Sequence, residues 1–258
     1  MFGFLKKRRR DRIRAEPFPP EWLVIIQRNV PMFARLSEAD RDELLRRVLV
    51  FIAEKNFEGA GGLTMTDEVR VTIAAQACML LLRLDDDDYY PRLRSIIVYP
   101  SAYKVPREAR AGEIVREHDA VHLGESWGDG AVVLSWNSAR HGAADPRDGK
   151  NVVLHEFAHQ LDQEDGAADG TPELDRLAFY APWARVLSEH YLALRKAART
   201  GRKTLLDQYG ATNEAEFFAV ASECFFERPV QLRTRHPELY DELSSYYGQD
   251  PARAATPA

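Results

Sequence analysis

Two histidines and a glutamate stand at a spacing that can bind a metal ion on a helix. The segment Asn151–Asp162 reads NVVLHEFAHQLD and contains His155, Glu156 and His159. Residues i and i+4 share one helix face, so both imidazoles can reach one ion. A catalytic zinc takes three protein ligands, leaves one position open and lowers the pKa of water there towards ~7. The pattern therefore predicts that His155 and His159 hold Zn²⁺ and that Glu156 is a general base.

The alternative is an ordinary helix that carries two histidines by chance. Apolar residues fill almost all other positions of NVVLHEFAHQLD, which predicts that this helix is buried on most sides. Burial of two histidines and a glutamate without partners would cost several kcal/mol. A metal ion removes that cost, so the sequence favours one Zn²⁺ per chain over the chance alternative.

The histidine pair leaves the third ligand open. The longer zincin pattern HExxHxxGxxH is excluded, because Asp162 and Asp165 stand where it needs glycine and histidine. The downstream histidines, His190 and His236, lie in polar surroundings and are unattractive ligands. Asp162 returns to the ligand face and could be a ligand or a helix-end residue. The interpretation that fits best is a carboxylate that accepts the second N–H of a zinc-bound imidazole.

Two glutamates are better candidates for the third ligand. Glu216 and Glu223 lie seven residues apart in the apolar segment TNEAEFFAVASECFFERP, so they share one helix face. A carboxylate in such surroundings needs a partner or an ion. Glu216 also fits a capping box that begins at Asn213, and Glu223 could pair with an arginine. Spacing alone does not choose between them.

The elements that must position these residues follow an α+β order. Helical patterns dominate residues 20–90. Short β-branched segments predict strands at 95–100 and 131–136, and a third strand is expected around Glu113–Glu117. Helical patterns return after residue 151. We expect one domain over 20–248, with a helical part (20–90) and a catalytic part (91–248). Residues 1–19 are expected to form a basic, proline-rich flexible tail, and 249–258 a disordered one.

Composition narrows the function classes. The net charge of −5 gives the chain as a whole no electrostatic reason to coat nucleic acid or an anionic membrane. Its apolar runs are too short to span a bilayer, and its start lacks the order of a secretory signal, so we expect a cytoplasmic protein. The basic run Lys6–Arg14 is interpreted as solvated, with weak contact to phosphate or a membrane surface as the alternative. Cys78 and Cys224 are expected to be buried thiols.

Several motifs together resemble one bacterial family. NVVLHEFAHQLD and YGATNEAEFFAVASECFFERP, with AAQACMLLLRL, IIVYP and GESWGDGAVVLSW upstream, are similar to the Mlc titration factor A family of zinc peptidases, over about Pro20–Tyr247. The C-terminal part also resembles the catalytic domain of anthrax lethal factor. The resemblance implies a zincin-like fold of gluzincin type, with Glu216 as third ligand and Tyr209 stabilising the oxyanion. Glu223 then becomes a carboxylate that supports the ligands or the structure.

The resemblance also implies a function. It suggests a zinc metallopeptidase with aminopeptidase character that acts on peptides, and a chain that binds the glucose-regulatory repressor Mlc and so controls the glucose phosphotransferase system. The alternative is a repressor-sequestering protein with minor or vestigial peptidase activity. A noncatalytic structural zinc site is a weaker alternative, because an open coordination position and a base are both available. The strand at 131–136 is expected to be the edge strand that pairs with substrate.

Overall fold

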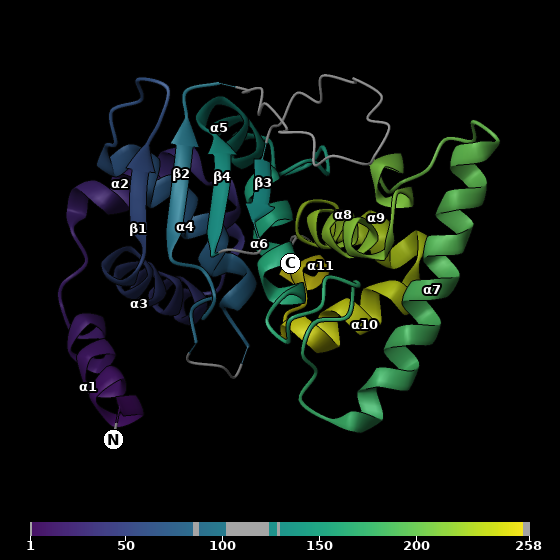
Figure 1. Ribbon diagram of the computed structural model, residues 1–258, viewed down its shortest axis with the longest axis horizontal. Coiled ribbons are helices and arrows are strands. Elements are labelled where there is room, and N and C mark those ends of the chain that lie inside the picture. The colour runs from purple at the N-terminus through teal and green to yellow at the C-terminus, as the bar shows by residue number, and fades with distance from the viewer. Residues whose placement is uncertain (1, 85–87, 102–123, 128–129, 255–258) are drawn as a thin grey trace, which may run out of the picture.

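Helices surround a small sheet in the structure, a computed structural model that describes residues 2–84, 88–101, 124–127 and 130–254 (Figure 1). The first half contains α1 (Phe2–Arg14), α2 (Pro20–Asn29), η1 (Pro31–Arg35), α3 (Glu38–Glu54), α4 (Asp67–Leu81) and α5 (Trp136–Ala144). The second half contains α6 (Val152–Asp162), α7 (Leu177–Arg199), η2 (Gln208–Ala211), α8 (Glu214–Glu227), α9 (Pro229–Arg235), α10 (Pro237–Tyr247) and α11 (Pro251–Ala254). This is the α+β organisation that the sequence predicts.

The sheet has four described strands in the order β1-β2-β4-β3 (Figure 1). They are β1 (Asn56–Gly59), β2 (Ser95–Tyr99), β3 (Gly124–Trp127) and β4 (Ala131–Ser135). The pairs β1–β2 and β2–β4 are parallel, whereas β3 runs antiparallel to β4. The strands expected at 95–100 and 131–136 are therefore present, and they belong to a mixed sheet. The strand expected around Glu113–Glu117 lies outside the described residues.

One expectation about the sheet is wrong. The segment at 131–136 was expected to be an edge strand, but β4 lies between β2 and β3 and pairs with both. Four of its five residues are buried, as an interior strand requires. Among the described strands, β3 is the edge strand on this side of the sheet, and it packs against α6. Apolar content marks a strand as buried but does not say which strand ends the sheet.

Helix α4 forms the centre of the first half. Its N-cap is Thr66, and almost every residue after its first turn is buried. It packs against α2, α3 and α6, so it connects the N-terminal helices to the helix that carries the two histidines. Aromatic contacts continue this connection, because the ring of Phe157 lies 4.9 Å from that of Tyr90 and 5.8 Å from that of Phe51. The buried cysteines Cys78 and Cys224 are free thiols, as expected.

Both ends of the described chain differ from the sequence prediction. The basic segment expected to be a flexible tail forms α1, which packs on α3. Arg10 and Arg14 form ion pairs with Glu54 and Glu43 at 2.6 and 2.7 Å, so partners on α3 order this segment. After residue 248 the chain continues into α11, where Ala252 is fully buried. Tail-like composition did not reveal these contacts.

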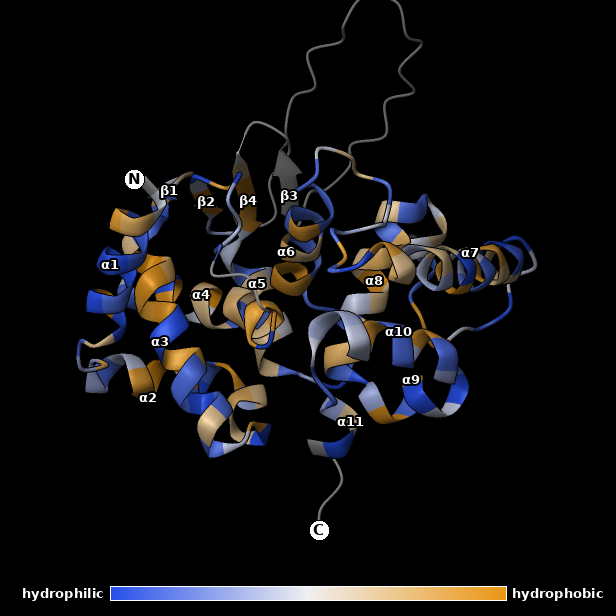
Figure 2. Cartoon of the chain, turned by 90° about the horizontal axis from the view of Figure 1, so that it is seen from below, coloured by the Kyte–Doolittle hydropathy of each residue, from blue (hydrophilic) through white to orange (hydrophobic). Residues whose placement is uncertain are grey.

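The helices that follow α6 form the other end of the molecule. Figures 1 and 2 both place α7 at the end opposite α1, with α8, α9 and α10 between α7 and the sheet. Helix α8 packs closely on α6, and η2 lies against both α7 and α8. Within the described ranges, none of the helices combines the length and apolar character needed to cross a membrane.

Candidate metal centre

Helix α6 is fixed at its start and along its buried sides. Asn151 is its N-cap, and the side-chain oxygen accepts hydrogen bonds from the N–H groups of Val153 and Leu154 at 3.1 and 3.0 Å. Helix α5 approaches this cap closely, because a Cβ added at Gly142 would lie 2.9 Å from the Cα of Asn151. The apolar residues of α6 are buried, namely Val153, Leu154, Phe157, Ala158 and Leu161. The remaining face carries His155 and His159 towards α8.

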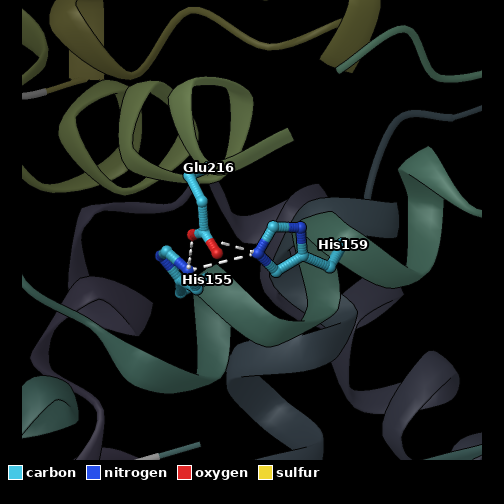
Figure 3. Close-up of side chains that lie close together, drawn as sticks. All are labelled: His155, His159 and Glu216. Atoms are coloured by element: carbon cyan, nitrogen blue, oxygen red, sulfur yellow. Dashed lines mark hydrogen bonds and ion pairs between the residues drawn. The ribbon is translucent and has the colours of Figure 1, made fainter. Parts of the chain in front are cut away.

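Helix α8 begins beside the two histidines. Asn213 is its N-cap and accepts a hydrogen bond from the N–H of Glu216 at 2.8 Å. The structure therefore contains the Asn213 cap that the capping-box alternative requires, but this cap uses only the backbone N–H of Glu216. The carboxylate of Glu216 points away from the cap and towards His155 and His159 (Figure 3). Capping and a ligand role are compatible, because they use different atoms of the residue.

Three potential ligand atoms converge between α6 and α8 (Figure 3). Oε2 of Glu216 lies 2.9 Å from Nε2 of His155 and 3.4 Å from Nε2 of His159. The two Nε2 atoms are 3.2 Å apart. In a tetrahedral site with metal–ligand distances of about 2.0–2.1 Å, neighbouring ligand atoms lie about 3.3 Å apart. The three donors therefore fit a small metal ion, and the group of potential ligands found among the described residues contains no fourth member.

Glu223 fixes the orientation of His155. Oε1 of Glu223 lies 2.7 Å from Nδ1 of His155, and its Oε2 accepts a hydrogen bond from the N–H of Asn151. If Nδ1 carries the proton and donates it to Glu223, the lone pair of Nε2 faces Glu216 and His159. This is the usual arrangement of a metal-binding imidazole. The structure thus gives the two candidate glutamates different positions: Glu216 lies at the convergence point and Glu223 behind His155.

Sequence reasoning missed Glu227, which is buried one turn beyond Glu223. Its Oε2 accepts hydrogen bonds from the N–H groups of Gly149 and Lys150, each at 2.9 Å. Together, Glu223 and Glu227 accept the three successive N–H groups that precede α6. The signal in the sequence was a second glutamate four residues after the first, in the otherwise apolar run ECFFE.

The carboxylates around His155 and His159 make the site suited to a cation. Burial alone would lower the pKa of His155, but hydrogen bonds with Glu216 and Glu223 outweigh it and hold this pKa well above its ordinary value. Burial likewise tends to raise the pKa of Glu216, but the two histidines hold it far below its usual range. Glu216, Glu223 and Glu156 thus surround the imidazoles with negative charge. A divalent cation would balance that charge without protonating a histidine.

Glu156 and Tyr209, the two proposed catalytic residues, differ in burial and come from different elements. Glu156 is only 6% exposed and comes from α6 beside His155. Tyr209, in η2, is 56% exposed, and its hydroxyl donates a hydrogen bond to Oε1 of Glu216 at 3.2 Å. Burial and then the charge of Glu216 raise the pKa of Tyr209 to about 12, so the phenol keeps its proton. Asp207 accepts a hydrogen bond from the N–H of Tyr209 and pairs with Lys150 at 3.1 Å, which ties η2 to the loop before α6.

Asp162 does not contact an imidazole through any described hydrogen bond. Its Oδ2 accepts the N–H of Gly170 at 3.0 Å, and its Oδ1 has no partner among the described residues. Burial raises its pKa to about 6. The role expected for Asp162, as acceptor from a histidine, therefore has no geometric support, and its contacts are with the loop before α7. His190 and His236 pack on each other at 5.3 Å, outside the cluster of His155, His159 and Glu216.

The family of this chain follows from comparison with known proteins. A family model described as glucose-regulated metallo-peptidase M90 matches residues 5–248. The chain belongs to this metallopeptidase family. The match to the family model begins at residue 5 and so includes most of α1. The resemblance seen in the sequence motifs began only at Pro20.

Relatives at moderate identity agree with this assignment. An uncharacterized protein of Synechocystis sp. is 40% identical over 245 residues, covering 94% of this chain and 89% of that protein. Mlc titration factor A of Klebsiella pneumoniae subsp. pneumoniae is 31% identical over 232 residues, covering 86% and 84%. The protein of the same name from Serratia proteamaculans is 30% identical over 226 residues, covering 86% and 85%. The resemblance to the Mlc titration factor A family is confirmed, and membership of a metallopeptidase family implies a metal ion.

Proposed function

We propose that this chain is a zinc-dependent metallopeptidase of gluzincin type. His155, His159 and Glu216 would hold one Zn²⁺, with Glu156 as general base and Tyr209 as oxyanion stabiliser. The observation that carries this proposal is the convergence of two Nε2 atoms and one carboxylate oxygen at 2.9–3.4 Å from each other. Two nitrogens and one oxygen are the donor set of thermolysin-type catalytic zinc sites.

Each residue has a role that its position supports. A zinc ion in this site would supply Lewis acidity, which acidifies water and polarises a peptide carbonyl. Glu156 would accept a proton from the attacking water and pass it to the leaving amine. The hydroxyl of Tyr209, exposed beside Glu216, would donate a hydrogen bond to the negative charge that develops on the carbonyl oxygen. Glu223 would keep His155 in the tautomer that offers Nε2.

For substrate, we propose peptides cleaved from the amino end, in a zincin-like architecture. The family resemblance supports the aminopeptidase character, and the mixed sheet beside α6 supports the architecture. The substrate backbone would pair with β3, the edge strand that packs against α6. Peptides with free and with acetylated amino ends separate the two specificities: equal cleavage of both would contradict an aminopeptidase.

The central test compares Glu156→Gln with the parent protein. Zinc per chain is measured first, and hydrolysis of short peptides second. We expect one zinc in both proteins and a loss of about 10²–10⁴-fold in hydrolysis for the variant. Glu214→Gln is the matched control, because Glu214 is an exposed glutamate in the first turn of α8. Parent-like hydrolysis by the Glu156 variant would sink the mechanism.

A second proposed role is binding of the repressor Mlc, chiefly or in addition to peptidase activity. It is supported by relatives named Mlc titration factor A that are 30–31% identical to this chain. Measuring the binding of purified Mlc to the zinc-loaded Glu156→Gln variant and to the parent protein shows whether binding needs catalysis. Binding without hydrolysis would establish a separate sequestering role, and the absence of binding by the parent protein would reject it.

A further inference from the structure

Helix α1 is attached to the fold by one of its faces. Lys6, Arg10 and Arg14 are four residues apart and therefore form one row along the helix. Lys6 pairs with Asp88 at 2.6 Å, and Arg10 forms two hydrogen bonds with Glu54, at 2.6 and 2.8 Å. Arg14 pairs with Glu43 on α3. A helix of 13 residues is marginal alone in water, so this inner row fixes its position and its orientation.

The opposite face of α1 has a different composition. Phe4, Arg8 and Arg12 form a second row, offset from the inner row by two residues and thus by about 200° around the helix. Phe4 is 65% exposed and neighbouring Leu5 is 59% exposed. Arg8 lies over the ring of Phe4 at 5.6 Å. Within the described residues, Lys7, Arg8 and Arg12 form no ion pair, so this outer face offers apolar and cationic groups together.

Charge is separated along the molecule. Helix α1 contains seven basic residues and one acidic residue, which gives it a formal charge of +6, whereas the whole chain carries −5. The rest of the chain therefore carries −11. Figures 1 and 2 place α1 at the end of the molecule away from α7, and Figure 2 shows it largely hydrophilic. A positive outer surface lies at one end of an acidic protein.

We propose that the outer face of α1 binds an anionic phospholipid surface. Arg8, Arg12 and Lys7 would contact lipid phosphates, while Phe4 and Leu5 would enter the boundary between headgroups and acyl chains. The inner row holds the helix rigidly against α3, so binding would orient the whole molecule with α1 towards the lipid. This goes beyond the peptidase function and does not depend on it.

The exposed apolar pair favours lipid over nucleic acid as the partner. Proteins that bind duplex DNA through its phosphates typically neutralise about 6–10 of them, whereas this face offers three cations without ion pairs. The apolar side chains of Phe4 and Leu5 would not contribute to binding a phosphate backbone. At a bilayer, their burial would add to the electrostatic attraction. The acidic remainder of the chain would also oppose wrapping by a long polyanion.

The test measures binding of the full chain to vesicles by co-sedimentation. Vesicles of phosphatidylcholine alone are compared with vesicles that also contain phosphatidylglycerol. We expect binding to the anionic vesicles only, weakened by salt. Arg8→Gln with Arg12→Gln should reduce it about 25-fold, at about five-fold per charge. Phe4→Ser with Leu5→Ser should reduce it at least about ten-fold. These outer residues contribute no described ion pair, so the melting temperature should not change.

Arg199→Gln with Arg202→Gln is the matched control, since Arg199 is the last residue of α7, Arg202 follows three residues later, and both are exposed. This variant should bind like the parent protein. Three results would each overturn the proposal: no binding of the parent protein to anionic vesicles, equal weakening by the control pair, or parent-like binding by both α1 variants. Tighter binding of the parent protein to a DNA duplex than to the vesicles would identify nucleic acid as the partner instead.

Discussion

Helix α8 meets the α6 region at two places that differ in exposure and in partner. Near its start, the side chain of Glu216 is 17% exposed and meets imidazole nitrogens beside the exposed ring of Tyr209. Two turns later the side chain of Glu223 is 9% exposed, and one turn further Glu227 is almost fully buried. Both accept backbone N–H groups before α6. We call Glu216 and Tyr209 the open end, and Glu223, Glu227 and Asn151 the buried end.

This difference suggests that the two ends of the contact between α6 and α8 have different roles. Groups at the open end lie beside the exposed ring of Tyr209, and their partners are side chains of the proposed site. Groups at the buried end bind backbone atoms, so they determine how α6 and α8 are placed relative to each other. Variants at the open end should therefore change zinc binding and catalysis most, and variants at the buried end should also change how the two helices are held together.

The largest effect is expected from Glu216→Ala at the open end. This change removes one of three proposed ligands, so we expect zinc affinity to fall by more than about 100-fold, beyond the range for a residue that supports a ligand. The melting temperature of the metal-free protein should fall as well, because the ion pairs of Glu216 with His155 and His159 are lost. Competition with a chelator measures the affinity, and Glu214→Ala is the control. Unchanged zinc affinity would reassign the third ligand.

Tyr209→Phe should affect catalysis alone. Loss of an oxyanion donor typically costs about 10²–10³-fold in kcat. Zinc content and melting temperature should not change, because the lost hydroxyl contacts only Glu216 in the described structure. Steady-state kinetics with a short peptide separate kcat from KM. An effect confined to KM would mean that Tyr209 binds substrate rather than stabilising charge.

Glu223→Gln tests the link between the two ends. The amide places an N–H₂ group against either Nδ1–H of His155 or N–H of Asn151, and an unsatisfied buried donor costs about 1–3 kcal/mol. We expect zinc affinity to fall about 10–100-fold, as for other partners of a metal-binding histidine. The metal-free protein should also unfold at a lower temperature, because Glu223 accepts the N–H of Asn151 just before α6. If stability and zinc affinity both stay at parent values, the two ends are independent.

The open end could be predicted from the sequence more fully than the buried end. Histidine spacing placed His155 and His159 on one face, and resemblance chose Glu216, which the geometry brings to them. Glu227 stands out as a second glutamate in the apolar run ECFFE, but its role could not be predicted, because its partners are backbone N–H groups, which leave no mark in residue types. The same holds for α1, whose basic residues are paired with acids on α3 that the local sequence does not show. The prediction of the edge strand failed for a related reason, since periodicity gives a face but not a neighbour, and the role of Asp162 beside a histidine stays a prediction.

The smallest effect on zinc binding and catalysis is expected from Glu227→Gln, whose effect appears in the pH dependence of stability. Burial raises the pKa of Glu227 to about 8 from an ordinary value of 4.5, so the folded protein holds this proton where the unfolded chain has lost it. Between pH 4.5 and 8 the free energy of unfolding should therefore fall with rising pH, by at most about 1.4 kcal/mol per pH unit from this group.

Glutamine stays neutral and its oxygen can still accept the N–H groups of Gly149 and Lys150. The variant should thus lose this slope and, at pH 8, be at least as stable as the parent protein. Urea unfolding at several pH values measures it, with Glu214→Gln as the control for removal of an exposed carboxylate. A variant that keeps the parent's slope would show that Glu227 is ionised in the folded protein. The buried end would then hold α6 through charge–dipole attraction rather than through a protonated acid.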